Sequence, residues 1–198
     1  MTADPGLDGP TEDFGQQIAD QVESFLLAVR AVAREGEAGS AISLLLLEIS
    51  QVLLAGARLG AQQDFVPAAE YQPDVGPEAD LDQLRLRLAD MLDGIDTYTF
   101  VFDPYAPDLV ESTLSGDLTS VAGDLENGLR HYRNGNVREA LWWWQFSYVS
   151  SWGNLAGAVL NALLSVVAHD RLDADFEGED EQVAAADQML EGGRAERR

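Results

Sequence analysis

Residues 128–163 read GLRHYRNGNVREALWWWQFSYVSSWGNLAGAVLNAL, and this stretch predicts the fold. Its NG pair is typical of a helix end, because Gly135 supplies the left-handed backbone conformation that closes helices. Asn136, with Glu139 three residues later, resembles a capping box and starts a second helix. We expect Gly153 to interrupt that helix before a further one begins. The stretch therefore predicts consecutive helices joined by short turns.

Helical periodicity separates the tryptophans of this stretch onto different faces. One stripe is expected to face the core and comprises Val137, Leu141, Trp144, Tyr148 and Trp152. A second stripe beside it, also expected to face the core, comprises Trp142, Phe146 and Val149. Trp143 points elsewhere, toward the side of Ser147 and Ser150. Two interpretations of Trp143 stay open: contact with another helix, or partial exposure and contact with a partner.

Apolar residues recur at intervals of three and four along much of the remaining chain, which predicts further amphipathic helices. Four helices are expected at 12–35, 40–61, 80–95 and 114–134. The fifth follows Asn136 and the sixth follows Gly153. Short turns imply antiparallel neighbours. The predicted fold class is all-α: a single domain of about six helices in mostly antiparallel up-and-down packing.

The helix at 40–61 is apolar almost all round, so we expect it in the middle of the bundle, covered on several sides. Its most apolar part, 41–57, is short for a bilayer span and carries Glu48 and Gln51 near its centre. These features favour a buried core helix over a membrane helix.

Two other segments lack a clear helical pattern. Residues 62–79 hold three prolines and form a long loop, which Phe65, Val66 and Tyr71 are expected to pin to the body. TYTFVFDPY at 97–105 alternates like a strand but also keeps helical spacing. Because no second strand candidate is evident, we predict a helix end and an aromatic loop there.

The ends of the chain are polar and acidic. Residues 1–11 are predicted to be a disordered leader and 172–198 a disordered acidic tail, which leaves 12–171 as the helical domain. The amino terminus has no basic segment followed by an apolar run, so a secretory signal is not indicated and a cytoplasmic location is expected.

Composition excludes several classes of function. The formal net charge is −23, from 35 acidic and 12 basic residues, which disfavours nucleic acid and anionic membrane surfaces as partners. The chain has no cysteine and two histidines, so neither a thiol nucleophile nor a metal site is predicted. The basic residues are all arginine, which is typical of a GC-rich host or of salt adaptation.

Sequence motifs give no catalytic residues and no cofactor. HExxH, GxxxxGK[ST], GxGxxG and GxSxG are all absent. Glu48, in the most apolar helix, is either half of a buried ion pair, the end of an exposed strip with Gln51, or a catalytic acid or base. The basic corner RHYRNGNVR is either a favourable set of cations at a helix C-terminus or a binding site for a carboxylate or an acidic peptide. It contains Arg130, His131, Arg133 and Arg138.

Three stretches resemble a known bacterial family, the domain of unknown function 5063. They are LLLLEISQVLLAG at 44–56, DPY at 103–105 and the long stretch at 128–163, whose most specific part is Ala140 to Gly153. The resemblance covers about residues 12–171. It implies a helical cytoplasmic bacterial protein of this size and brings no activity, cofactor or catalytic residue.

Our leading hypothesis from the sequence is a non-enzymatic helical domain that binds a protein partner, with Trp143 and the basic corner as the candidate contact residues. The alternative is an enzyme or small-ligand binder with an interhelical site made of Glu48, arginine and aromatic residues. A closed cavity lined by Glu48 and an arginine would favour the enzyme. An open groove beside Trp143 would favour the binder.

Overall fold

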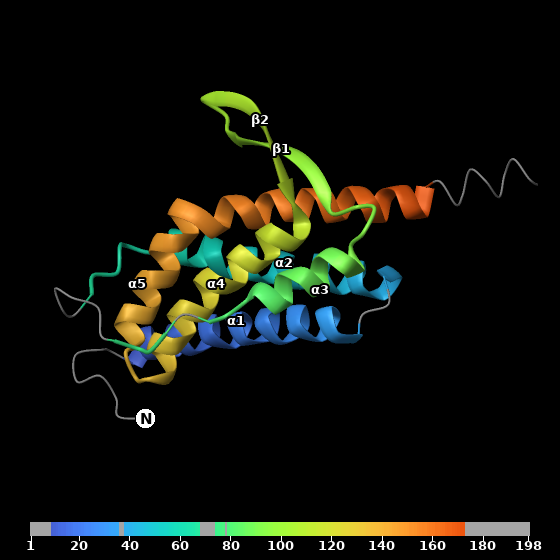
Figure 1. Cartoon of the computed structure of the whole chain (residues 1–198). Helices are drawn as coiled ribbons and strands as arrows, with labels where there is room; N and C mark the ends of the chain where they lie inside the picture. Colours follow the sequence, from blue (N-terminus) through green and yellow to red (C-terminus); the bar gives the residue numbers. More distant parts are fainter. Residues whose placement is uncertain (1–8, 36–37, 68–73, 78, 173–198) are drawn as a thin grey trace, which may run out of the picture. The chain divides into compact units, whose positions relative to one another are not determined.

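The computed structural model describes residues 9–35, 38–67, 74–77 and 79–172. The chain divides into two compact units, Met1–Leu163 and Leu164–Arg198, and every contact discussed below lies in the first. The described residues form five helices, one fewer than the six predicted, and one two-stranded sheet, so the predicted all-α fold class is broadly confirmed (Figure 1). The helices are α1 (Gly9–Glu35), α2 (Ala38–Gly60), α3 (Asp82–Met91), α4 (Leu114–Arg133) and α5 (Val137–Ser147), the last running on through a π-helical turn, η1 (Tyr148–Trp152), into a helix at 153–172.

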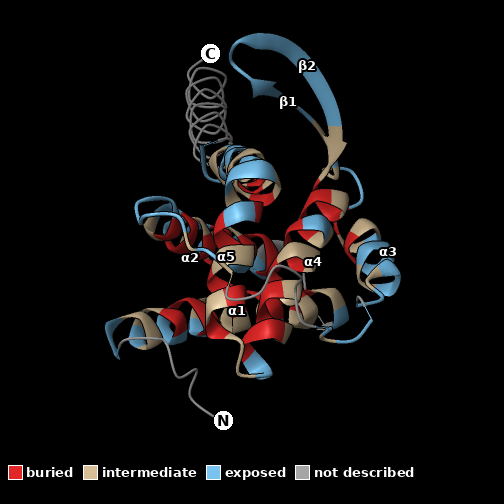
Figure 2. Cartoon of the chain, turned by 90° about the vertical axis from the view of Figure 1, so that its left-hand side faces the viewer, coloured by how far each residue is buried: buried red, intermediate tan, exposed pale blue. Residues whose placement is uncertain are grey.

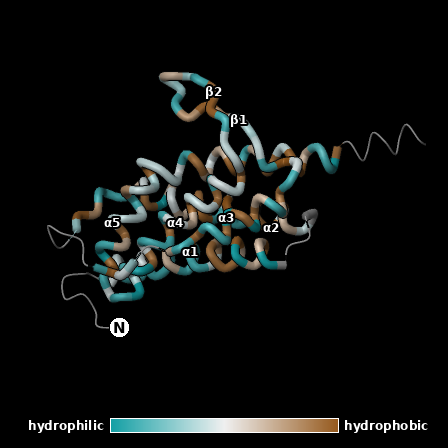
Figure 3. Tube along the Cα trace, in the orientation of Figure 1, coloured by the Kyte–Doolittle hydropathy of each residue, from teal (hydrophilic) through white to brown (hydrophobic). Residues whose placement is uncertain are grey.

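The core lies where α1, α2, α4 and α5 meet. Figure 2 shows buried residues along the sides of α1, α4 and α5 that face one another. The apolar residues of α1 recur every three or four positions, which Figure 3 shows as alternating brown and teal along that helix. Fully buried side chains of the core include Ile18, Phe25, Leu45, Ile49, Leu118, Leu125, Trp144 and Trp152.

The turn between α4 and α5 follows the sequence prediction in one respect and departs from it in another. Gly135 has a φ of 83°, the left-handed conformation expected of it. The predicted capping box at Asn136 is wrong, because the Asn136 side chain makes no cap hydrogen bond. Its backbone N–H donates instead to the His131 carbonyl at 3.0 Å, and Glu139 is buried. The chain's reversal therefore depends on main-chain hydrogen bonds.

The predicted helix break at Gly153 is also wrong. Gly153 has helical φ and ψ of −63° and −40°, and the helix continues from η1 into residues 153–172. A Cβ at this position would collide with the carbonyl oxygen and ring of Tyr148. Gly153 therefore permits the wider π turn that carries Tyr148 and Trp152 toward α2; it does not end the helix.

The aromatic residues of α5 and η1 divide differently from the two predicted core stripes. Trp144 and Trp152 are fully buried, as predicted. The second stripe does not face the core: Phe146 and Val149 are exposed, and Trp142 is half-buried with its ring stacked on Phe146 at 5.3 Å. These residues lie on the solvent side because the helix has α2 and α4 as neighbours on its other sides.

The predicted aromatic loop at 97–105 is a β-strand. It forms β1 (Thr97–Asp103), which pairs in antiparallel register with β2 (Ala106–Thr113). The partner strand, APDLVEST, is hard to recognise because it contains a proline and two acids and is mostly exposed (Figure 2). Backbone hydrogen bonds with β1 stabilise it without apolar alternation. The fold is mostly helical with one small hairpin.

Other boundaries and loop contacts differ from the predictions in smaller ways. Helix α1 begins at Gly9, three residues before the predicted start, so 9–11 are helical and not part of a leader. In the loop after α2, Phe65 contacts the body as predicted: its ring stacks on Phe14 at 6.3 Å. Val66 is exposed. Tyr71, and the predicted disorder of 1–8 and 173–198, lie outside the described residues.

Helix α2 is only partly covered, contrary to the expectation that it lies in the middle of the bundle. One face is buried against α1, α5 and η1. The opposite face exposes Leu44, Leu47 and Leu54. By length and hydropathy, Ser40–Gly60 and Val137–Leu172 are each sufficient to cross a membrane, so the argument that α2 is too short does not hold. Core helices of soluble proteins have the same properties, and α2 contributes a full buried face to this core.

Candidate binding clefts

An open cleft of about 280 Å³ lies beside Trp143. One wall is the polar face of α4, and the other is the segment that precedes α3 together with the Trp143 ring. Its lining residues are Ala79, Leu81, Ser120, Gly123, Asp124, Asn127, Arg130 and Trp143. This is the open groove beside Trp143 that would favour a binding protein over an enzyme.

Trp143 and Asp124 meet at one end of this cleft. The Trp143 indole N–H donates to the Asp124 main-chain carbonyl at 3.0 Å, which fixes the ring against α4. Trp143 is half-buried, so part of its surface stays accessible. Burial raises the pKa of the Asp124 carboxyl above its ordinary value, and a hydrogen bond with the Ser151 side chain partly offsets that rise. The cleft thus presents a partly desolvated carboxyl group beside an aromatic ring.

Arg130 and Asn127 form the other end of the cleft. Arg130 donates to the main-chain carbonyls of Gly76 and Pro77 and to the Asn127 side-chain oxygen. These bonds hold the segment at 74–77 against α4. Six residues separate Arg130 from Asp124, a rise of about 9 Å along the helix. The cleft therefore has a positive end and a negative end rather than one sign of charge.

The other members of the basic corner do not converge on this cleft. Arg133 pairs with Glu23 of α1 at 3.0 Å. His131 is buried, and burial is the main cause that lowers its pKa. The nearby Glu139 charge raises this pKa, and the Arg130 charge lowers it further. Arg138 lies on α5 and has its own interaction. The three arginines and His131 of the basic corner are therefore not gathered in this cleft: Arg130 lines it, and Arg133 pairs with α1.

Glu48 lines neither the cleft beside Trp143 nor a second groove, which lies between α1 and α2. It is buried between α2 and α1, where its carboxylate accepts a hydrogen bond from the Ser24 hydroxyl at 3.1 Å. This position favours a structural role, because a buried carboxylate needs a donor and Ser24 supplies one.

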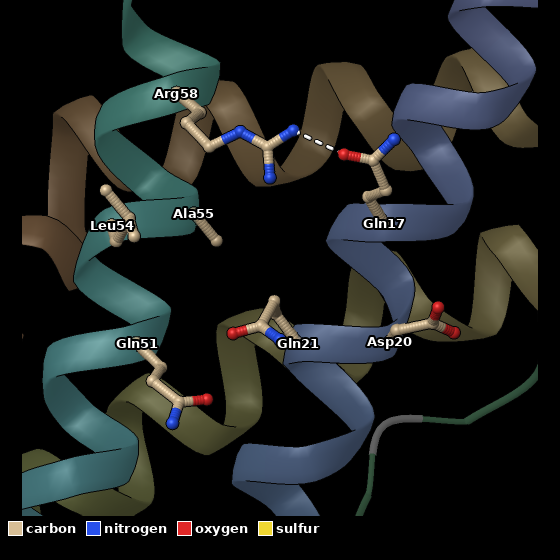
Figure 4. Close-up of a pocket in the computed structure, with 7 residues that line it drawn as sticks. All are labelled: Gln17, Asp20, Gln21, Gln51, Leu54, Ala55 and Arg58. Carbon is tan, nitrogen blue, oxygen red and sulfur yellow. Dashed lines mark hydrogen bonds between the residues drawn. The ribbon is translucent and has the colours of Figure 1, made fainter.

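A second, larger groove of about 460 Å³ separates the outer surfaces of α1 and α2 (Figure 4). It is lined by Gln17, Asp20, Gln21, Gln51, Leu54, Ala55 and Arg58. Arg58 spans it, donating to the Gln17 side-chain oxygen at 2.6 Å and lying 5.2 Å from the centre of the Phe14 ring. The amide groups give this groove both donors and acceptors, and Leu54 connects it to the exposed face of α2.

The sequence prediction included Trp143 and Arg130 but missed Asp124 and Asn127. These two and Arg130 recur every three residues on α4, which places them on one side of the helix. That spacing was a usable signal for a polar face. No signal in the sequence showed that this polar face lies beside Trp143, because that contact depends on how α5 packs against α4. Within the described ranges, no group of three or more His, Cys, Asp or Glu side chains is placed to hold a metal ion.

The fold and clefts define a mostly helical domain with two open surface grooves. A family model described as a domain of unknown function, DUF5063, matches residues 10–169, and the chain belongs to this family. The crystal structure of protein BF1032 from Bacteroides fragilis is similar in fold, with a TM-score of 0.62 and 15% sequence identity over 76% of this chain and 90% of that one. No curated protein matches the chain.

Proposed function

We propose that this chain is a protein-binding domain that recognises a basic segment of a partner protein in the cleft beside Trp143. The observation that carries the proposal is the position of Asp124 and Trp143 at one end of an open cleft. A guanidinium or ammonium group beside them would meet a carboxyl group and the face of an indole ring. Both interactions strengthen where water is partly excluded.

The charge of the whole chain supports the same class of partner. A net charge of −23 attracts cationic segments and repels acidic ones over the range of a Debye length. Arg130 lies about 9 Å from Asp124, at the opposite end of the cleft. There it suits the carbonyl or carboxylate groups of a bound peptide better than a second cation. A cytoplasmic location, and the expected absence of nucleic-acid and membrane partners, belong to this proposal.

The proposal is tested by titrating an arginine-containing blocked peptide into the full chain. The readout is the Trp143 indole N–H signal in a ¹H–¹⁵N spectrum, assigned as the signal that Trp143→Phe removes. We expect that signal to shift with the arginine peptide and to stay in place with a glutamine peptide of otherwise identical sequence. Binding is expected to weaken when salt is raised from about 0.05 M to about 0.3 M, because screening reduces charge attraction.

Matched charge variants locate the site. Asp124→Asn is expected to weaken binding roughly tenfold or more, the range of a lost charge-assisted hydrogen bond. Asp108→Asn removes the same charge from an exposed position on β2, outside the cleft, and is expected to leave binding nearly unchanged. Equal effects of the two variants, or an unmoved Trp143 signal at millimolar peptide, would refute the proposal.

A further inference from the structure

The outer face of α2 combines exposed leucines with small residues in a regular order. Five exposed residues of α2 follow one another at alternating intervals of four and three: Ser43, Leu47, Ser50, Leu54 and Ala57. This is a heptad stripe in which each leucine alternates with a small residue. The stripe carries no charge, although the chain as a whole carries −23. Exposed leucines on a charge-free stripe of so acidic a protein favour an interface at this face.

We propose that this face of α2 binds the same face of a second copy of the chain, in an antiparallel homodimer. The stripe has two kinds of position, which alternate: the leucines and the small residues. In an antiparallel pair of helices, each position of one kind lies opposite a position of the other kind on the partner. Leu47 then lies opposite the partner's Ala57 or the partner's Ser50, depending on register, and Leu54 lies opposite a small residue in both registers. Each leucine fills the space above a small side chain. The face is therefore complementary to itself under two-fold symmetry.

The absence of charge on this stripe favours a second copy of the chain as its partner. Two molecules that each carry −23 repel one another, so self-association needs a face without carboxylates. Along Ser40–Gly60 the charged residues are Glu48, which is buried, and Arg58, which bonds to Gln17. The groove in Figure 4 lies beside the stripe, and its glutamine amides would form the polar rim of the interface.

The expected affinity is modest. Helix α2 has 23 residues and is therefore about 35 Å long, which gives an interface at the small end of the specific range of roughly 1,200–2,000 Å². A dissociation constant on the order of micromolar is expected. Salt should strengthen this dimer, because screening weakens the repulsion between the two acidic molecules while the apolar contact is unaffected. The peptide binding proposed at Trp143 has the opposite salt dependence.

Sedimentation of the full chain over a range of concentrations tests the proposal. The wild type is expected to dimerise with rising concentration, and more strongly at about 0.5 M salt than at about 0.05 M. Leu47→Glu with Leu54→Glu should be monomeric throughout. The matched control is Leu86→Glu with Leu27→Glu, on α3 and α1. These two leucines are 57% and 67% exposed, which is close to the 52% of Leu47 and the 64% of Leu54. Circular dichroism of both double variants checks that they fold.

Single cysteines define the orientation, since the chain has no cysteine of its own. In either antiparallel register the two Ser50 positions are offset by roughly 6 Å or less along the axis, and the two Ser43 positions by roughly 16 Å or more. A short bismaleimide should therefore cross-link Ser50→Cys and leave Ser43→Cys uncoupled.

Four results would overturn the proposal. The first is a wild type that stays monomeric at every concentration. The second is a dimer that survives in Leu47→Glu with Leu54→Glu. The third is cross-linking of both cysteine variants, which indicates a parallel pair. The fourth is binding of the wild type to neutral lipid vesicles through the same leucines in place of dimerisation. Each of these can occur whether or not a basic peptide binds beside Trp143, because the stripe shares no residue with that cleft.

Discussion

The Trp144 indole lies beside Gly128, in the space that a side-chain carbon at position 128 would occupy. Its N–H donates to the Leu125 carbonyl at 3.0 Å, so the ring is fixed against α4 by a hydrogen bond as well as by packing. The absence of a side chain at Gly128 is what lets α5 approach α4 closely enough for this bond. Gly128 lies in the α4 helix, so its role is to supply space and not backbone freedom.

Gly128→Ala is expected to destabilise the protein by about 1–3 kcal/mol, the cost of overpacking a filled core. The added methyl group would overlap the Trp144 ring and force the two helices apart. Gly157→Ala is the control, because a Cβ at Gly157 meets no atom within 4 Å. That change should stabilise the protein by about 0.5–1 kcal/mol through helix propensity. Urea unfolding measures both, and equal signs for the two variants would contradict the packing argument.

The two neighbouring tryptophans are expected to differ in their contribution to stability. Trp144→Ala should cost about 3–5 kcal/mol, because it empties a fully buried site. Trp143→Ala should cost about 1–2 kcal/mol, since the ring is half-buried and loses one hydrogen bond. Chemical denaturation of both variants gives the comparison. If Trp143→Ala proves as damaging as Trp144→Ala, Trp143 is a core residue and the cleft proposal loses its main support.

Tyr98 connects the hairpin to α4 by a hydrogen bond from its hydroxyl to the Asp117 carboxylate, at 2.6 Å. Burial, followed by this bond and the Asp117 charge, raises the pKa of Tyr98 above its ordinary value. Tyr98→Phe is expected to lower the free energy of unfolding by about 1.5–3 kcal/mol, as for a bond to a charged group. Tyr105→Phe, at a position 97% exposed, should have no measurable effect. Similar losses in both variants would argue against the bond.

His131 is expected to make stability depend on pH. Burial lowers its folded-state pKa below 6.5, so the unfolded chain binds this proton first as the pH falls. The contribution of neutral His131 is therefore intact above about pH 6.5 and is lost progressively below it. From about pH 7.5 to about pH 5.5 the urea midpoint should fall further in the wild type than in His131→Gln. Parallel curves for the two proteins would show that His131 is not the group responsible.

The sequence predicted the helices because their apolar residues repeat at the helical period, and that signal is local. It also placed Trp144 and Trp152 in the core. It did not predict β2, since an exposed strand needs no apolar alternation and its stability comes from pairing with β1. The continuous helix through Gly153 was missed for a similar reason: Gly153 is required by the packing of Tyr148, which local sequence does not reveal.

Function-related features divide in the same way. The sequence by itself determined the acidity of the chain and the lack of catalytic motifs, and it contained the three-residue spacing of Asp124, Asn127 and Arg130 on α4. Tertiary structure alone decided that Asp124 meets Trp143 in an open cleft and that the leucines of α2 face solvent. Periodicity gives the angle between residues on one helix. It does not give the neighbour on each side, because burial depends on contacts between segments far apart in the chain.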